Sequence, residues 1–217
     1  LRKGKNMKKT LIALATLGAL TGVAHADSNV SIYGLIDASV RSASHQNNDG
    51  DRLNSVENGL LQGNRLGFKG QEDLGNGLKA VFQLESGFNI NNGSSAQNGA
   101  LFSRIATVGL SDATYGTLTV GRQNTLAYDT VIATDVYGEA NNIALAGYQS
   151  TLTGFRWDNS VKYVNKYNGF NYGAQYSSGN QAGSNSKNSG YALNGGYTGS
   201  NWSLQAVYQL GHDTKDA

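Results

Sequence analysis

Nine segments of this sequence alternate polar and apolar side chains with a period of two residues. In residues 170–177, for example, Phe170, Tyr172 and Tyr176 alternate with Asn171 and Gln175. This period is the spacing of a β-strand whose two faces meet different surroundings. The segments cover residues 30–40, 63–71, 78–88, 102–110, 115–122, 157–164, 170–177, 189–198 and 202–210.

The connections between these segments alternate between long and short along the whole chain. Long polar connections cover residues 41–62, 86–100, 123–155 and 178–188, and short ones cover 72–77, 111–114, 165–169 and 199–200. A soluble sandwich has no reason to keep every second turn short, whereas a transmembrane barrel has short periplasmic turns and long external loops. The pattern therefore predicts an all-β chain that forms a transmembrane up-and-down antiparallel β-barrel. A secreted soluble β-domain with an aromatic core is the alternative that the pattern leaves open.

The composition is typical of sheets with a thin apolar band rather than a thick core. Only 39% of the residues are apolar, while 29 are Gly and 12 are Tyr. The absence of Pro leaves the long strands without the residue that breaks a sheet ladder. The absence of Cys excludes disulfides, thiolate metal sites and Cys nucleophiles. Aromatic residues near strand ends suit the two interfaces of a membrane, namely Tyr33, Phe88, Phe102, Tyr115, Trp157, Phe170, Tyr191, Tyr197 and Trp202.

Residues 1–26 have the three regions of a secretory signal peptide. Five basic residues precede an apolar run over residues 10–23, which ends at Ala24-His25-Ala26. Leu1–Asn6 before Met7 is interpreted as an upstream extension, and an uncleaved anchor is the alternative for the apolar run. Removing five of the 17 basic residues leaves 12 basic against 15 acidic side chains, a net charge of −3. The basic pI of the whole chain therefore gives no support to a nucleic-acid partner.

The residues that most often carry catalysis are sparse and scattered. His45 and His212 lie in polar loops, without a neighbouring Ser and acid. The pair Glu72-Asp73 lies in a tight turn, where Asp is expected for turn hydrogen bonds. We therefore expect no enzymatic activity, no metal site and no cofactor.

Four pieces of the chain, in this order and spacing, resemble the N-terminal half of the general porins of β-proteobacteria. They read NVSIYGLIDASV, NRLGFKGQEDLGNGLKAVFQLESGF, FSRIATVGLSDATYGTLTVGRQ and GFNYGAQYSSG, and the resemblance covers essentially residues 27–210. It implies a 16-stranded outer-membrane barrel, assembled as a homotrimer, that lets small hydrophilic solutes and ions diffuse passively. It also implies contact with outer-membrane lipid and lipopolysaccharide, and with the outer-membrane assembly machinery.

The resemblance further implies a constriction inside the barrel. The connection after GRQ, about Asn124–Gly154, stands where the family has the third external loop folded into the lumen. Its acids Asp129, Asp135 and Glu139 would face a basic wall of Arg65, Lys69, Lys79, Arg104 and Arg122. Such an arrangement sets a transverse field across a narrow aqueous opening. Strict alternation from Leu118 and Val120 would turn Arg122 toward lipid unless a bulge intervenes.

The hairpin Gly63–Phe88 should then have two environments. Its turn Glu72–Gly77 is expected at the periplasmic rim, with Arg65, Lys69 and Lys79 facing water and Leu66, Phe68, Phe82 and Leu84 facing lipid or a neighbouring subunit.

The chain carries about nine of the expected 16 strands. We therefore expect residues 27–217 to be the N-terminal portion of a porin barrel after removal of residues 1–26. Two alternatives to a diffusion pore are a surface adhesin or structural outer-membrane barrel, and a truncated fragment without function.

Overall fold

The computed structural model of the chain describes residues 29–59, 61–97, 99–133 and 154–212. The expected signal peptide and the loop acids Asp135 and Glu139 lie outside these residues. Within the described ranges, none of the helices has both the length and the apolar character that crossing a membrane requires.

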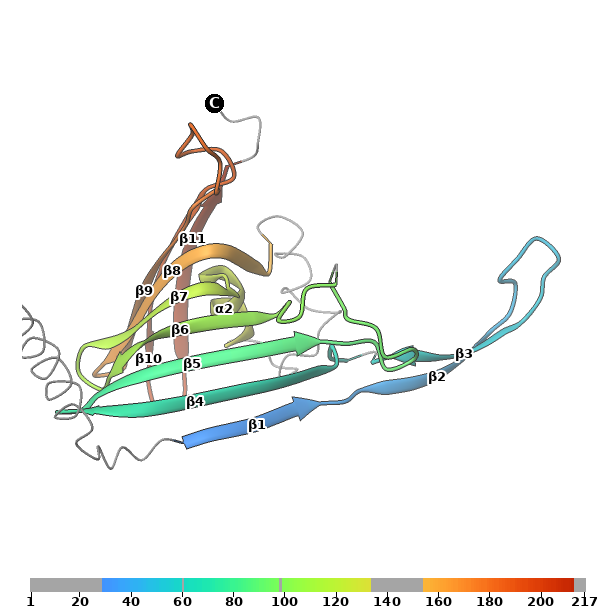
Figure 1. The fold of residues 1–217 in the computed structure, drawn as a ribbon, viewed down its shortest axis with the longest axis horizontal. Helices are drawn as coiled ribbons and strands as arrows, with labels where there is room; N and C mark the ends of the chain where they lie inside the picture. Colours follow the sequence, from blue (N-terminus) through green and yellow to red (C-terminus); the bar gives the residue numbers. More distant parts are fainter. Residues whose placement is uncertain (1–28, 60, 98, 134–153, 213–217) are drawn as a thin grey trace, which may run out of the picture.

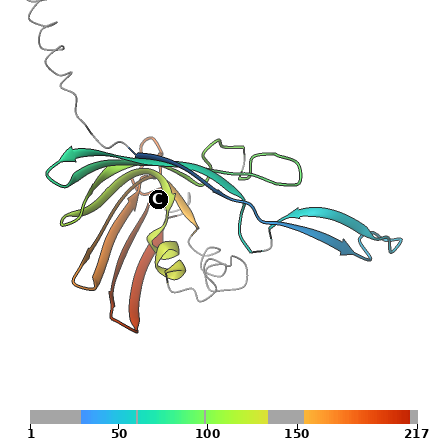
Figure 2. The ribbon, with the colours of Figure 1, turned by 90° about the horizontal axis from the view of Figure 1, so that it is seen from below.

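Nine strands form one antiparallel sheet whose neighbours are mostly consecutive in the chain, in the order β1-β4-β5-β6-β7-β8-β9-β10-β11. The sheet curves so strongly that it encloses a hollow on one side, and we call its two sides the concave and the convex face (Figure 1 and Figure 2). The strands are β1 Asn29–Leu35, β4 Arg65–Gly75, β5 Leu78–Gly87, β6 Ile105–Asp112, β7 Gly116–Asn124, β8 Arg156–Tyr167, β9 Phe170–Ser177, β10 Gly190–Thr198 and β11 Ser203–Gly211. The predicted antiparallel fold and its alternation of short turns and long connections are confirmed.

The short turns use residues that accept a positive φ. In the β4–β5 turn, Asn76 and Gly77 have φ of 53° and 86°, and in the β8–β9 turn Asn168 and Gly169 have φ of 47° and 84°. Two successive residues of positive φ make the turn whose twist matches that of paired strands. These Asn-Gly pairs therefore fix the register of the hairpins on which they lie.

The sequence prediction missed a second, two-stranded sheet. The segment expected as one strand over residues 30–40 ends at Leu35, and β2 (Ala38–Ala43) pairs with β3 (Leu53–Asn58) inside the expected polar connection. The break is at Asp37, whose Oδ2 accepts hydrogen bonds of 2.9 Å from the backbone N–H groups of Leu61 and Gln62. The β2–β3 hairpin extends away from the end of the nine-stranded sheet in both views (Figure 1 and Figure 2).

The two faces of the sheet have opposite character. On the concave face the register aligns Lys69, Gln83, Thr107 and Gly121 across β4, β5, β6 and β7. On the convex face it aligns apolar side chains that stay exposed, such as Val108 and Val120, which are 56% and 42% exposed. The hairpin Gly63–Phe88 follows the same division, with Lys69 opposite Gln83 on one face and Phe68 opposite Leu84 on the other.

The single described helix, α2 (Leu126–Ile132), lies in the hollow against β9, β10 and β11 (Figure 2). Leu126 and Ala127 of the helix and Ala192 of β10 are the buried apolar residues of the described chain. The core is small because most apolar side chains lie on the convex face.

Candidate functional site

Three arginines from different parts of the sheet line one cavity of about 420 Å³ on the concave side. Arg65 begins β4, Arg156 begins β8, and Arg104 precedes β6 by one residue. Tyr33 and Glu85 also line the cavity, as does Tyr128 of α2. The cavity thus has three cationic side chains and one carboxylate, so it attracts anions.

Glu85 connects this cluster to the wall. Its Oε1 accepts from Arg104 Nε at 2.5 Å, and its Oε2 accepts from the Tyr33 hydroxyl at 2.8 Å. The Tyr33 oxygen accepts in turn from Gln83 Nε2 at 2.6 Å. The Tyr33 ring lies directly over Gly67, where any Cβ would collide with it. The lack of a side chain at Gly67 therefore lets Tyr33 reach Glu85.

The two expected wall lysines, Lys69 and Lys79, form no ion pair with another described residue. Lys69 has its Nζ 5.4 Å from the centre of the Tyr33 ring, a cation–π contact. Lys79 is the register partner of Asp73 near the β4–β5 turn. Neither lysine forms an ion pair with a residue of the described ranges. Both lie on the concave face, because Lys69 is the register partner of Gln83 and Lys79 lies four residues before Gln83 in the same strand.

Arg122 does not join the arginine cavity. Its Nε donates to the backbone oxygen of Ser103 at 2.6 Å, and its NH1 pairs with Asp158 at 2.6 Å. The register between β7 and β8 shifts between Gly121 and Gln123. Such a bulge is what Arg122 would need in order to leave the face of Leu118 and Val120. Arg122 consequently contacts the segment before β6 and the start of β8 rather than the other predicted wall residues.

Asp129 lies on α2 and is paired locally. Its Oδ2 accepts from Lys162 Nζ at 2.8 Å, and its Oδ1 accepts from Asn124 Nδ2 at 3.1 Å. The structure therefore brings Asp129 together with Lys162 of β8, and not with Arg65, Lys69 or Lys79.

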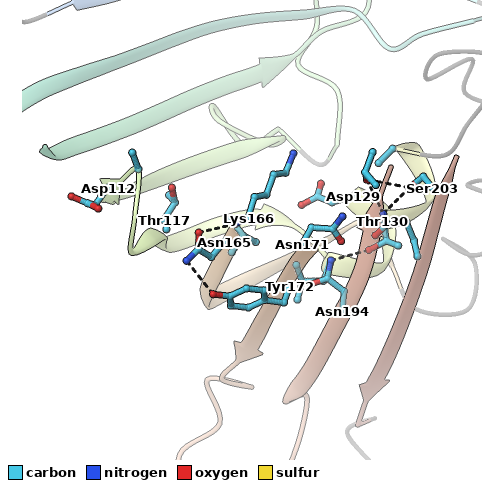
Figure 3. A pocket seen from close by; sticks show the side chains of 17 residues that line it. Asp112, Thr117, Asp129, Thr130, Asn165, Lys166, Asn171, Tyr172, Asn194 and Ser203 are labelled. Carbon is cyan, nitrogen blue, oxygen red and sulfur yellow. Dashed lines mark hydrogen bonds between the residues drawn. The ribbon is translucent and has the colours of Figure 1, made fainter. Parts of the chain in front are cut away.

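A larger cavity of about 660 Å³ lies between α2 and the short-turn ends of β6 to β11 (Figure 3). Its labelled side chains are mostly polar and include Asp112, Lys166 and Asn171. Inside it Asn194 donates to Thr130 Oγ1 at 3.3 Å, and Asn165 donates to Tyr172 at 3.2 Å. No group of three His, Cys, Asp or Glu side chains in the described residues is arranged to hold a metal ion.

Arg156, Glu85 and Lys162 take part in the arginine cavity or in the contact with α2, and none of them was among the predicted site residues. Arg156 is the first residue after the longest connection, one position before the predicted strand. Glu85 lies two residues after Gln83, and Lys162 lies two residues after Ser160, so each is on the polar face of its strand. The alternation of polar and apolar residues could therefore have identified both.

The comparisons with known proteins agree with this geometry. A family model described as Gram-negative porin matches residues 11–217. An outer membrane porin protein of Bordetella pertussis is 42% identical over 185 residues, which are 79% of this chain and 48% of that protein. Outer membrane porin protein 32 of Delftia acidovorans is 36% identical over 181 residues, or 78% and 49% of the two chains.

Solved structures show the same fold. An anion-selective porin from Comamonas acidovorans superposes with a TM-score of 0.67 at 24% identity, over 86% of this chain and 59% of that one. OmpT of Vibrio cholerae, in its trimer form, gives 0.61 at 17% identity, over 86% and 51%. This chain spans about half the length of the curated relatives it matches. By its sequence over residues 11–217, the chain belongs to the Gram-negative porin family.

Proposed function

We propose that the protein is an outer-membrane porin through which small hydrophilic solutes and ions diffuse passively. The observation that carries this proposal is the division of the sheet into an exposed apolar convex face and a charged concave face with α2 in its hollow. An apolar outer surface suits lipid, and a charged inner surface suits water. The arrangement requires no covalent chemistry and no cofactor.

The described sheet ends at two edge strands, β1 and β11. In lipid, each unpaired backbone group costs several kcal/mol, so a membrane sheet must close on itself. We infer that further strands complete the barrel in the assembled protein and that residues 27–217 supply its N-terminal portion. Three such barrels would form a homotrimer, with residues 1–26 serving for export. Outer-membrane lipid, lipopolysaccharide and the assembly machinery are the partners that this location implies.

The charges favour anions as the preferred ions. Arg65, Arg104 and Arg156 share one cavity with a single carboxylate, and Lys69 and Lys79, which form no ion pair within the described residues, add two cations to the same face. Asp129 contributes little opposing field, because Lys162 neutralises it at 2.8 Å. Asp135 and Glu139 remain proposed as the acids that face the basic wall. An anion concentrated by this wall stays in contact with water in an open cavity, so it would cross without tight binding.

Single-channel recording in planar bilayers tests the proposal. The protein purified from outer membranes should give ohmic conductance steps and a reversal potential, in a KCl gradient, on the anion side. Replacing Arg156 by Met should move the reversal potential toward cations. The matched control is Arg52→Gln in the β2–β3 connection, which removes one positive charge away from the concave face and should leave the potential unchanged.

Two results would overturn the proposal. Assembled protein that gives no conductance steps would rule out a diffusion pore and would favour the adhesin or structural barrel. Equal reversal potentials for the Arg156→Met variant and the unaltered protein would rule out the basic wall as the source of ion preference.

A further inference from the structure

We propose that Gln175 and Lys162 are positioning residues that hold α2 against the inner wall and so fix the width of the pore. The inference rests on the proposed diffusion function, since only a pore gives the position of α2 a functional consequence. Its structural part, the docking of α2 by side chains of the wall, can be tested separately.

The helix depends on the wall for its first hydrogen bonds. An isolated helix of seven residues is unstable in water, and the first N–H groups of any helix lack partners within it. Here the N–H of Leu126 donates to Gln175 Oε1 of β9 at 2.8 Å, and that of Ala127 donates to Gln209 Oε1 of β11 at 3.3 Å. Two strands of the barrel wall thus supply acceptors that a helix usually obtains from its own cap.

Hydrogen bonds of Thr125 also join the two ends of the loop that carries α2. The Thr125 backbone N–H donates to the oxygen of Phe155 at 3.0 Å, and its hydroxyl donates to the oxygen of Gly154 at 3.2 Å. The hydroxyl also accepts from the N–H of Tyr128, as an N-cap does. Thr125 is fully buried, so the chain enters and leaves the loop through one fixed point.

A buried network of hydrogen bonds holds the side-chain amide of Gln175 in place. Its Nε2 donates to the backbone oxygen of Asn124 at 3.2 Å and lies 3.4 Å from Ser160 Oγ. Ser160 Oγ accepts from Gln123 Nε2 at 3.1 Å and donates to the oxygen of Gly121 at 2.9 Å. Gln123, Ser160 and Gln175 are each less than 5% exposed. Such a network fixes the Gln175 amide in one orientation, with its oxygen toward the helix.

Lys162 holds the next part of the helix. Its Nζ donates to the oxygen of Asn124 at 3.0 Å and to Asp129 at 2.8 Å, and its side chain is only 12% exposed. The ion pair therefore joins the middle of α2 to β8 at a partly dehydrated site, where a charge-assisted bond is strong. Asp129 serves docking rather than the field across the pore.

The experiment measures docking by thiol labelling. Because residues 1–217 contain no Cys, Leu126→Cys gives this part of the protein one thiol, at a side chain that is fully buried in the docked helix, and protein without that substitution gives the background labelling. The rate of labelling by a water-soluble maleimide is then compared in assembled protein with and without Gln175→Met. Methionine keeps the volume of glutamine and removes its hydrogen bonds. Gln71→Met is the matched control, because Gln71 lies on β4, far along the sheet order from β9.

We expect Gln175→Met to raise the labelling rate about tenfold, because the bond from the Leu126 N–H is the one hydrogen bond of the Gln175 side chain that reaches the helix itself. Lys162→Met should raise it to a similar extent, and Gln71→Met should leave it unchanged. The open-channel current of the first two variants should also fluctuate more. Labelling of the Gln175→Met protein at the control rate would overturn the inference. A protein that shows the expected labelling but never conducts would instead refute the pore and leave the docking intact.

Discussion

The substitution Glu85→Gln tests whether the arginine cavity sets the proposed ion preference. Glu85 is the single carboxylate of that cavity and is 5% exposed. Glutamine keeps its shape and one acceptor oxygen but removes the negative charge. Arg104 then loses its ion-pair partner, and the positive charge of the cavity rises by one.

The expected magnitude follows from Coulomb's law. A permeating ion about 8 Å from the changed charge, in water, gains or loses about 0.5 kcal/mol, which is about a twofold change in local concentration. Anions gain and cations lose, so their permeability ratio should rise about two- to fivefold after screening by salt. The loss of the charge-assisted bond to Arg104 should also destabilise the protein by about 1–2 kcal/mol.

The assay is the reversal potential in a KCl gradient, together with unfolding of the assembled protein in lipid vesicles. Glu57→Gln on β3 is the control, because it removes an equal charge from the exposed Arg41–Glu57 pair on the projecting hairpin. That substitution should change neither quantity by a measurable amount. A reversal potential that is unchanged in correctly assembled Glu85→Gln protein, or that moves toward cations, would refute the assignment of this cavity.

Two further substitutions test the faces of the sheet and its backbone. Val108→Arg, on the convex face, should cost about 2–4 kcal/mol of unfolding free energy in lipid, whereas Thr107→Arg on the concave face should cost little; equal costs would contradict the division into faces. Gly121→Ala should destabilise the assembled protein by at least about 2 kcal/mol, because φ at Gly121 is +124° and a Cβ would meet the backbone oxygen of Ala106. Gly211→Ala, where a Cβ would meet nothing, is its control, and equal unfolding midpoints for the two variants would be the contrary result.

The sheet could be predicted from the sequence because one face of each strand is apolar. Phe68 opposite Leu84, and Val108 opposite Val120, keep the period of two that sequence reasoning detects. The β2–β3 hairpin escaped detection because its two apolar cross-strand pairs, Val40–Val56 and Ala43–Leu53, lie on opposite faces, and the other four pairs are polar or mixed. Its existence depends on backbone pairing and on the break at Asp37, and neither leaves a periodic signal.

The face on which the predicted wall residues lie could be read from the sequence for a related reason. Arg65, Lys69 and Lys79 lie within regular strands, so alternation places them correctly on the concave face. Arg156 stands at a strand end, where the period stops, and only the fold brings it beside Arg65 and Arg104. The pairing of Asp129 with Lys162 joins residues 33 positions apart through a helix in the hollow, and no local pattern reveals such a contact.

Few apolar side chains are buried among the residues that the structure describes, and this has a consequence for when the chain becomes stable. Leu126, Ala127 and Ala192 cannot provide the free energy that orders nine strands, since a fully buried Leu contributes only about 1.5–3 kcal/mol. The larger hydrophobic gain must come from transfer of the convex face into a bilayer. For this protein the bilayer is then a thermodynamic component of the native state. A measured free energy of unfolding therefore describes the chain together with its lipid, and not the chain alone. Before insertion, the same apolar face and open strand edges would promote aggregation in water.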